Sequence, residues 1–211
     1  MRSIIVLAAA SLASACSLMT PADPAKTSFD FGPLTSNPVL LRTVNRPFVV
    51  TEITAPAWLD NSSMYYRLVY RNADNPLPYR ASGWVMPPAA LLTRRLQAQL
   101  SPVTWEVDDR TAGESTQRYV LSGELLEFEQ VFDAPGHSRG VLRLRAAIEG
   151  GSWSAERTFS VEEPAPTPDA RGGVVALVRC SNVLARDIAE WVATIGRESG
   201  GQPVAGSPLG H

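Results

Sequence analysis

The stretch from residue 139 to residue 148 restricts the possible folds most strongly, because polar and apolar residues alternate along it with a period of two. Every second residue from Leu142 onward is apolar, whereas Arg139, Arg143 and Arg145 fall on the opposite side of an extended chain. Such alternation is typical of a β-strand with one face on a hydrophobic core and the other face in solvent.

A glycine pair and a second alternating stretch predict that this strand turns back on itself. Gly150-Gly151 is followed by Trp153–Val161, which repeats the alternation. Glycine adopts positive φ angles freely, as a tight hairpin requires. Tyr119–Phe132 is long enough to be a third strand of the same meander, with Gly123 as the expected position of a bulge.

Shorter strand patterns occupy the first half of the chain. The segments with this pattern are Thr27–Phe31, Phe48–Thr54, Met64–Arg71, which is rich in tyrosine, and a few residues around Tyr79. Proline and glycine interrupt the sequence between them, so each strand is expected to be short.

Two amphipathic helices complete the pattern. The first is expected to start at Pro87 and carries leucines at intervals of four residues, with Arg95 on its polar side. The second is expected to start near Asp169 and to end at Gly196, and its apolar stripe indicates core packing. Strands, a helix, further strands and a final helix predict an α+β fold: a mixed, mainly antiparallel sheet with two helices packed on one face.

The amino-terminal residues have the pattern of an export signal. Arg2 precedes the apolar run Ile4–Leu12, which is too short to span a bilayer, and small residues then lead to Cys16. These small residues resemble a bacterial lipobox, although Ala13 stands where leucine is usual. A lipobox cysteine receives a diacylglycerol and an N-acyl chain, and Ser17 after it, by resemblance to enterobacterial lipoproteins, points to the outer membrane. Cleavage by ordinary signal peptidase, giving a soluble secreted protein, is the alternative.

These signals divide the 211-residue chain into four expected segments. They are a signal peptide (1–15), a lipidated tether (16–26), one folded domain (27–195) and a disordered tail (196–211). The length that remains after cleavage suits one well-buried domain.

Charge and composition exclude several classes of function. The formal net charge of −2 and the absence of any lysine or arginine block argue against a nucleic-acid partner. If Cys16 is acylated, Cys180 has no disulfide partner and is expected to be a buried small hydrophobe. His137 and His211 lie far apart in sequence, so neither a metal site nor a cofactor is expected.

The motifs that resemble catalytic signatures have structural explanations. Gly136–Gly140 matches the hydrolase pattern G-x-S-x-G around Ser138, but that pattern works where a strand leads into a helix. Here it joins two expected strands, so a turn is the better interpretation. Glu127 and Glu129 are expected to lie on a solvated face. We therefore expect no enzyme, and an exported hydrolase is the least favoured function.

The chain from Phe29 to Ile195 resembles the ABC-type transport auxiliary lipoproteins. The resemblance rests on Phe29–Pro33, on Ala55–Asp60, on the tyrosine-rich strand that leads to Trp84, and on Leu126–Asp133. It implies a lipoprotein of the outer membrane that faces the periplasm and has no catalytic residues. It also implies work with an inner-membrane ABC permease and ATPase, and with a mammalian-cell-entry (MCE) substrate-binding protein, in lipid traffic between membranes.

Two groups of side chains are candidates for an interface with these partners or with a second copy of the chain. The first group is aromatic and comprises Tyr65, Tyr66, Tyr70, Tyr79 and Trp84; the second is a positive stripe of Arg139, Arg143 and Arg145. Ordinary packing is the alternative for the aromatic group, and a solvated sheet face is the alternative for the arginines. A lipoprotein that binds a ligand in its own pocket, without a transporter, is the alternative function.

Overall fold

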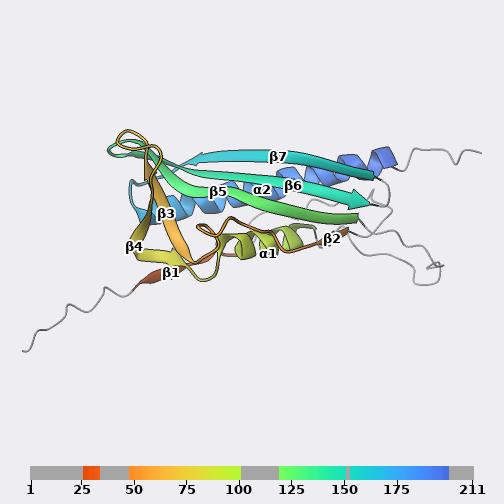
Figure 1. The fold of residues 1–211 in the computed structure, drawn as a ribbon, viewed down its shortest axis with the longest axis horizontal. Helices are drawn as coiled ribbons and strands as arrows, with labels where there is room; N and C mark the ends of the chain where they lie inside the picture. Colours follow the sequence, from red (N-terminus) through yellow and green to blue (C-terminus); the bar gives the residue numbers. More distant parts are fainter. Residues whose placement is uncertain (1–25, 34–47, 101–118, 151–152, 200–211) are drawn as a thin grey trace, which may run out of the picture.

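The computed structural model of the chain describes residues 26–33, 48–100, 119–150 and 153–199. These residues form seven strands and two helices (Figure 1). The strands are β1 (Thr27–Phe29), β2 (Phe48–Val50), β3 (Ser63–Leu68), β4 (Pro76–Trp84), β5 (Tyr119–Ala134), β6 (His137–Gly150) and β7 (Trp153–Pro164). The helices are α1 (Pro88–Leu100) and α2 (Ala170–Ser199).

All seven strands belong to one sheet, in the order β1-β4-β3-β5-β6-β7, with β2 also paired to β5. The strands β5, β6 and β7 form the expected antiparallel meander, and β3 pairs antiparallel with β4. The pairs β1–β4, β2–β5 and β3–β5 are parallel. The 16-residue strand β5 can therefore hold β2 at one end and β3 at the other while β6 lines its opposite edge. The predicted mixed, mainly antiparallel sheet is confirmed.

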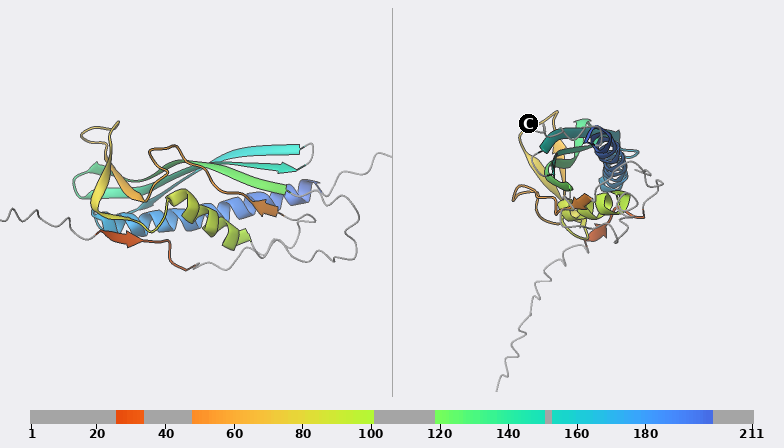
Figure 2. Two further views of the ribbon diagram at one scale, coloured as in Figure 1. Left: turned by 60° about the horizontal axis from the view of Figure 1, so that its bottom comes forward. Right: turned by 90° about the vertical axis from the view of Figure 1, so that its right-hand side faces the viewer.

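Both helices lie on the same side of this sheet, as predicted. The helix α2 packs along β6 and β7, and α1 lies beside α2 and near β2 and β5. The end-on view in Figure 2 shows the sheet curving around the two helices. The alternating residues of β6 explain the layering, because Leu142 and Leu144 are buried under the helices whereas Arg143 and Arg145 are exposed.

One glycine sets how closely α2 approaches the sheet. A Cβ atom on Gly140 would lie 2.9 Å from the backbone nitrogen of Leu177 in α2, closer than real Cβ atoms come. Cys180, one turn further along α2, is fully buried, as expected of a small hydrophobe, and its Sγ lies 3.5 Å from the carbonyl oxygen of Gly140. The strand and the helix are therefore in direct backbone contact here.

The start of α2 matches the sequence pattern, but its end differs. Asp169 caps the helix, because its Oδ1 accepts a hydrogen bond of 2.8 Å from the backbone N–H of Gly172. This bond and one from the Thr167 hydroxyl lower the pKa of the Asp169 carboxyl. The helix continues to Ser199, beyond the Gly196 expected to end it. The remainder of the expected tail, residues 200–211, lies outside the described residues.

The strand β5 is irregular after Leu125 and not at Gly123. The register of β5 on β6 shifts between Leu125 and Glu127, and again between Phe132 and Ala134. At Gly123 both edges of β5 are occupied, because its carbonyl also accepts a hydrogen bond of 2.9 Å from the backbone N–H of Thr54. The extra residue falls between the pairing with Thr54 and the pairing with β3, where the second edge of β5 is less constrained.

Candidate functional site

Some aromatic side chains of β3 and its flanking residues are exposed, whereas others pack against neighbouring residues of the sheet. Tyr70 is 42% exposed. Tyr65 is half-buried, packs edge-on against the exposed Trp58 with ring centroids 5.5 Å apart, and accepts a hydrogen bond from Asn61 Nδ2. Tyr66 packs on Tyr79, with ring centroids 4.6 Å apart. Within the aromatic group, Tyr70 is therefore exposed and Tyr65 is partly exposed beside Trp58.

Trp84, in contrast, belongs to the hydrophobic core. It is 3% exposed, and its ring lies 5.7 Å from that of Phe31 and 5.4 Å from that of Phe128. The expectation that Trp84 belongs to an interface is therefore wrong, and ordinary packing, the alternative for the aromatic group, holds for this residue. Its neighbour Val85 is 55% exposed.

The three arginines of β6 lie on one face, as predicted, but each faces a carboxylate. Arg139 pairs with Asp133 and, at 2.8 Å, with Glu162. The other two pairs are Arg143 with Glu127, at 3.5 Å, and Arg145 with Glu124. The arginine stripe is therefore part of a ladder of alternating charges across β5, β6 and β7. Exposed pairs of this kind contribute about 0–1 kcal/mol each, so the ladder is mainly a charged surface.

The G-x-S-x-G segment forms the hairpin between β5 and β6. Gly136 has a φ of 86°, which suits glycine in a tight turn, and the turn leads into a strand. The Ser138 hydroxyl accepts a hydrogen bond of 2.8 Å from Gln130 Nε2, and Gln130 Oε1 accepts one of 2.8 Å from the Tyr79 hydroxyl. Burial raises the pKa of Tyr79. Ser138 is thus one end of a part-buried polar chain, and it lies in a turn between two strands, as the sequence predicted.

Glu129 is buried, which corrects the expectation that it lies on a solvated face. It is 3% exposed, and its Oε1 lies 2.7 Å from Nε of Arg67 on the neighbouring strand β3. Burial raises the pKa of the Glu129 carboxyl despite the opposing effect of Arg67. The parallel pairing of β3 with β5 covers this position, and no local pattern in the sequence indicates that pairing.

We expect Arg67→Met to lower the free energy of unfolding by about 1–3 kcal/mol, because it leaves the Glu129 carboxylate buried without its cation. The double variant Arg67→Met/Glu129→Gln should recover part of this loss, since a neutral amide is cheaper to bury than a lone carboxylate. Urea denaturation of both variants and of Glu129→Gln alone measures the energetic coupling between Arg67 and Glu129. A double variant less stable than Arg67→Met would contradict this pairing.

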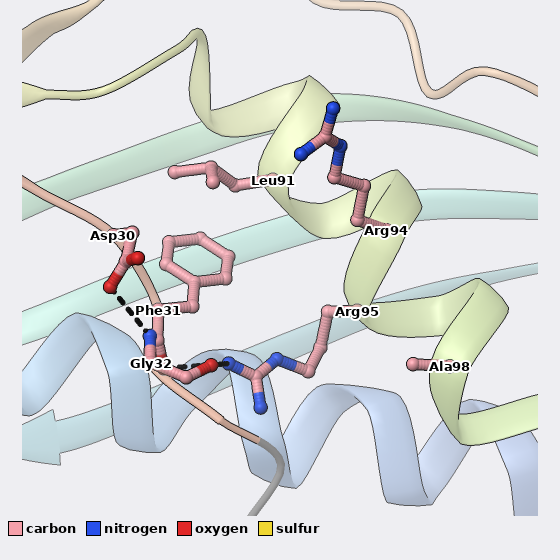
Figure 3. Close-up of a pocket in the computed structure, with 7 residues that line it drawn as sticks. All are labelled: Asp30, Phe31, Gly32, Leu91, Arg94, Arg95 and Ala98. Carbon is pink, nitrogen blue, oxygen red and sulfur yellow. Dashed lines mark hydrogen bonds between the residues drawn. The ribbon is translucent and has the colours of Figure 1, made fainter.

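Arg95 on α1 forms a second buried site, although the sequence pattern placed this residue on the polar side of the helix. It is 5% exposed, and its guanidinium donates to the carbonyl oxygens of Phe31 at 2.6 Å and Gly32 at 2.8 Å (Figure 3). A longer contact of 3.4 Å reaches the carbonyl of Pro33. Burial lowers the pKa of the guanidinium, and Asp30 partly offsets that effect. Arg95 therefore clamps the segment after β1 to α1.

An open hollow of about 270 Å³ lies beside this clamp, between α1 and the segment after β1. It is lined by Asp30, Phe31, Gly32, Leu91, Arg94, Arg95 and Ala98. In Figure 3 the Arg95 side chain reaches toward Gly32 whereas Arg94 points away from it. The donors of Arg95 are directed at backbone carbonyls, so this hollow offers a ligand mainly apolar walls together with the exposed side chains of Asp30 and Arg94.

A second open hollow, of about 530 Å³, lies on the outer face of the sheet. Its polar lining includes Glu52, Glu124, Glu156 and Arg145. Across the described ranges, no group of three or more His, Cys, Asp or Glu side chains is placed to hold a metal ion. None of the helices in the described part combines the length and apolarity that a membrane span needs. The fold and its surfaces define a class of small α+β domain with a charged outer face.

The comparisons with known proteins then name the family. The sequence matches the family model of the ABC-type transport auxiliary lipoprotein component over residues 35–189, which is more than half of the chain. The chain belongs to this family of transport auxiliary components, as its resemblance implied. A comparison with curated proteins finds no significant match.

Solved structures share the fold at low sequence identity. Protein XCC0632 from Xanthomonas campestris, assigned to the family DUF330, is 16% identical with a TM-score of 0.64, and the match covers 85% of this chain and 98% of that one. An uncharacterized protein is also 16% identical, with a TM-score of 0.60 and coverage of 80% and 99%. These likenesses concern the fold alone.

Proposed function

We propose that this protein is an outer-membrane lipoprotein facing the periplasm and an auxiliary component of an MCE-type ABC transport system. In this role it docks to partner proteins and supports lipid traffic between the inner and outer membranes. The observation that carries the proposal is the family match over residues 35–189. The export signal that ends at Cys16 supplies the anchor, although Cys16 itself lies outside the described residues.

The surfaces of the domain favour docking over a ligand-binding role. Both hollows are open, and the buried polar groups nearest to them, Arg95 above all, are occupied by bonds within the chain. The exposed aromatic residues Trp58 and Tyr70 and the charge ladder on β6 are better suited to contact another protein. Gly172-Gly173 lacks the lysine of a phosphate loop, so the ATPase of the system belongs to another chain.

The docking proposal is tested by photocrosslinking in cells. A benzoylphenylalanine at Tyr70 should crosslink to the MCE substrate-binding protein, identified by mass spectrometry. The same group at Arg179, an exposed residue of α2, serves as the control on another face of the molecule. Absence of any MCE or ABC permease product at Tyr70, with the protein correctly localised, would contradict docking through this surface.

The anchor has its own test in Cys16→Ser. Each buried CH₂ of an acyl chain contributes about 0.8 kcal/mol, so two or three chains give effectively permanent attachment. Cys16→Ser should move nearly all of the protein out of the outer-membrane fraction or leave it unprocessed, as fractionation and intact-mass spectrometry measure. Cys180→Ala, which alters only the buried thiol, should stay in the membrane. A Cys16→Ser protein that keeps its normal mature mass and membrane fraction would refute the anchor.

A further inference from the structure

The outer edge of β7 is a long strand edge that no other described element pairs with. The sheet ends at β7, which has 12 residues and contacts only β6 and α2 to any extent (Figure 1). The opposite end of the sheet is the three-residue strand β1. Native proteins usually shorten, bend or cover such edges, because their free N–H and C=O groups can template pairing with another chain.

The register of β6 on β7 identifies which backbone groups point outward. Ala165 donates from its backbone N–H to the carbonyl of Ser138, and the register continues without a shift to Gly150 opposite Trp153. Because alternate residues of an antiparallel strand bond to the same neighbour, the outward groups belong to the even-numbered residues. These are Ser154, Glu156, Thr158, Ser160 and Glu162, and all five side chains are exposed.

Apart from the charges of Glu156, Glu162 and Glu163, the devices that protect edges are sparse along this strand. Its register has no bulge, and its one proline, Pro164, is at the end, where its missing N–H would point outward. Arg157 is the single basic residue, and its guanidinium lies 4.9 Å from the centre of the Phe159 ring. No described residue therefore pairs with the outer side of the central nine residues of this edge, which a further strand can extend.

We propose that this edge pairs with β7 of a second copy of the chain, antiparallel and centred on Thr158, so that two sheets join into one. The charges along this edge are compatible with a second copy of the same strand, and they select this register. With Thr158 opposite itself, Glu156 faces Ser160 of the second copy and Glu162 faces Ser154, so no like charges are opposed. Arg157 then faces Phe159 of the second copy and keeps an aromatic ring beside it.

Two-fold pairings centred on residues near Thr158 are less favourable than the pairing centred on Thr158 itself. Centring on Glu156 or on Arg157 places a like charge directly opposite itself, and centring on Phe159 places Glu156 opposite Glu162; such contacts destabilise paired strands. Centring on Ser160 brings Pro164 into the pairing, where it has no N–H to donate. The Thr158 register alone brings all five outward residues into hydrogen-bonded pairs.

The test is a cysteine scan of the full-length protein in the periplasm, read as disulfide-linked dimer on non-reducing gels. In the proposed register the two Thr158 Cα atoms are about 5.5 Å apart, within the range that a disulfide spans. Arg143 on β6 lies opposite Ser160 and is equally exposed, but three strand spacings of about 4.8 Å separate it from its copy. Thr158→Cys should therefore give about ten-fold more dimer than Arg143→Cys.

The rest of the scan checks the register. Glu156→Cys and Ser160→Cys should each crosslink weakly alone, and strongly when the two variants are expressed together, because these positions face one another. The unmodified protein in detergent should also have the protein mass of a dimer in light scattering. Crosslinking of Thr158→Cys at the level of Arg143→Cys, a maximum at Ser160→Cys, or a monomeric mass would each overturn the proposal.

Discussion

Replacing Trp84 by alanine is expected to lower the free energy of unfolding by about 3–5 kcal/mol, the usual cost of removing a buried aromatic side chain. The ring is 3% exposed and contacts both Phe31 and Phe128, so alanine would leave a cavity where β1, β4 and β5 meet the helices. The aromatic contacts themselves add about 0.5–1.5 kcal/mol beyond the buried area.

Tyr70→Ala is the matched control for this experiment. Tyr70 was part of the same aromatic group in the sequence, but it is 42% exposed, so its removal should change stability by no more than about 0.5 kcal/mol. Urea denaturation followed by circular dichroism measures both variants without relying on tryptophan fluorescence. Equal losses for the two variants would contradict the division of this group into core and surface.

Arg95→Met is expected to lower the free energy of unfolding by about 2–4 kcal/mol. The substitution removes the donors that satisfy the Phe31 and Gly32 carbonyls but keeps the apolar stem of the side chain. The largest local effect should fall on β1, which the clamp holds beside α1. Hydrogen exchange at the amide of Val85 reports this effect, because the Val85 N–H donates a hydrogen bond of 2.9 Å to the carbonyl oxygen of Phe29 in β1.

The adjacent arginine provides the control for the clamp. Arg94→Met replaces an exposed side chain of the same helix and should change stability by no more than about 0.5 kcal/mol. The stability of Arg95→Lys should lie between those of Arg94→Met and Arg95→Met. Lysine keeps the charge but cannot donate as a planar fork to several carbonyls. If Arg94→Met and Arg95→Met were equally stable, the carbonyl contacts would be energetically unimportant.

Much of the fold follows from periodicity in the sequence. The strict alternation of β6 predicted both its buried leucines and its outward arginines, because a strand has only two faces. The position of Asp169 predicted the start of α2, because capping is a local interaction between a side chain and the backbone two or three residues on. The tight turn at Gly136 was predictable for the same reason.

The candidate sites were less predictable, because their partners lie far away in the sequence. Arg95 occupies a polar position of an amphipathic helix, yet it is buried because the segment after β1 crosses over it, 62 to 64 residues away along the chain. Glu129 is buried because β3 pairs parallel to β5, and Arg67 is 62 residues from it. Neither partner leaves a signal in the local pattern.

Local sequence alone therefore determined the two faces of β6, the amphipathic helices and the α+β class, since all of these depend on contacts within a few residues. Tertiary structure decided which polar residues are buried, which arginines are already paired and which strand has an edge that no described residue pairs with. These properties depend on the order of strands in the sheet, and that order arises from packing between segments that are distant in the chain.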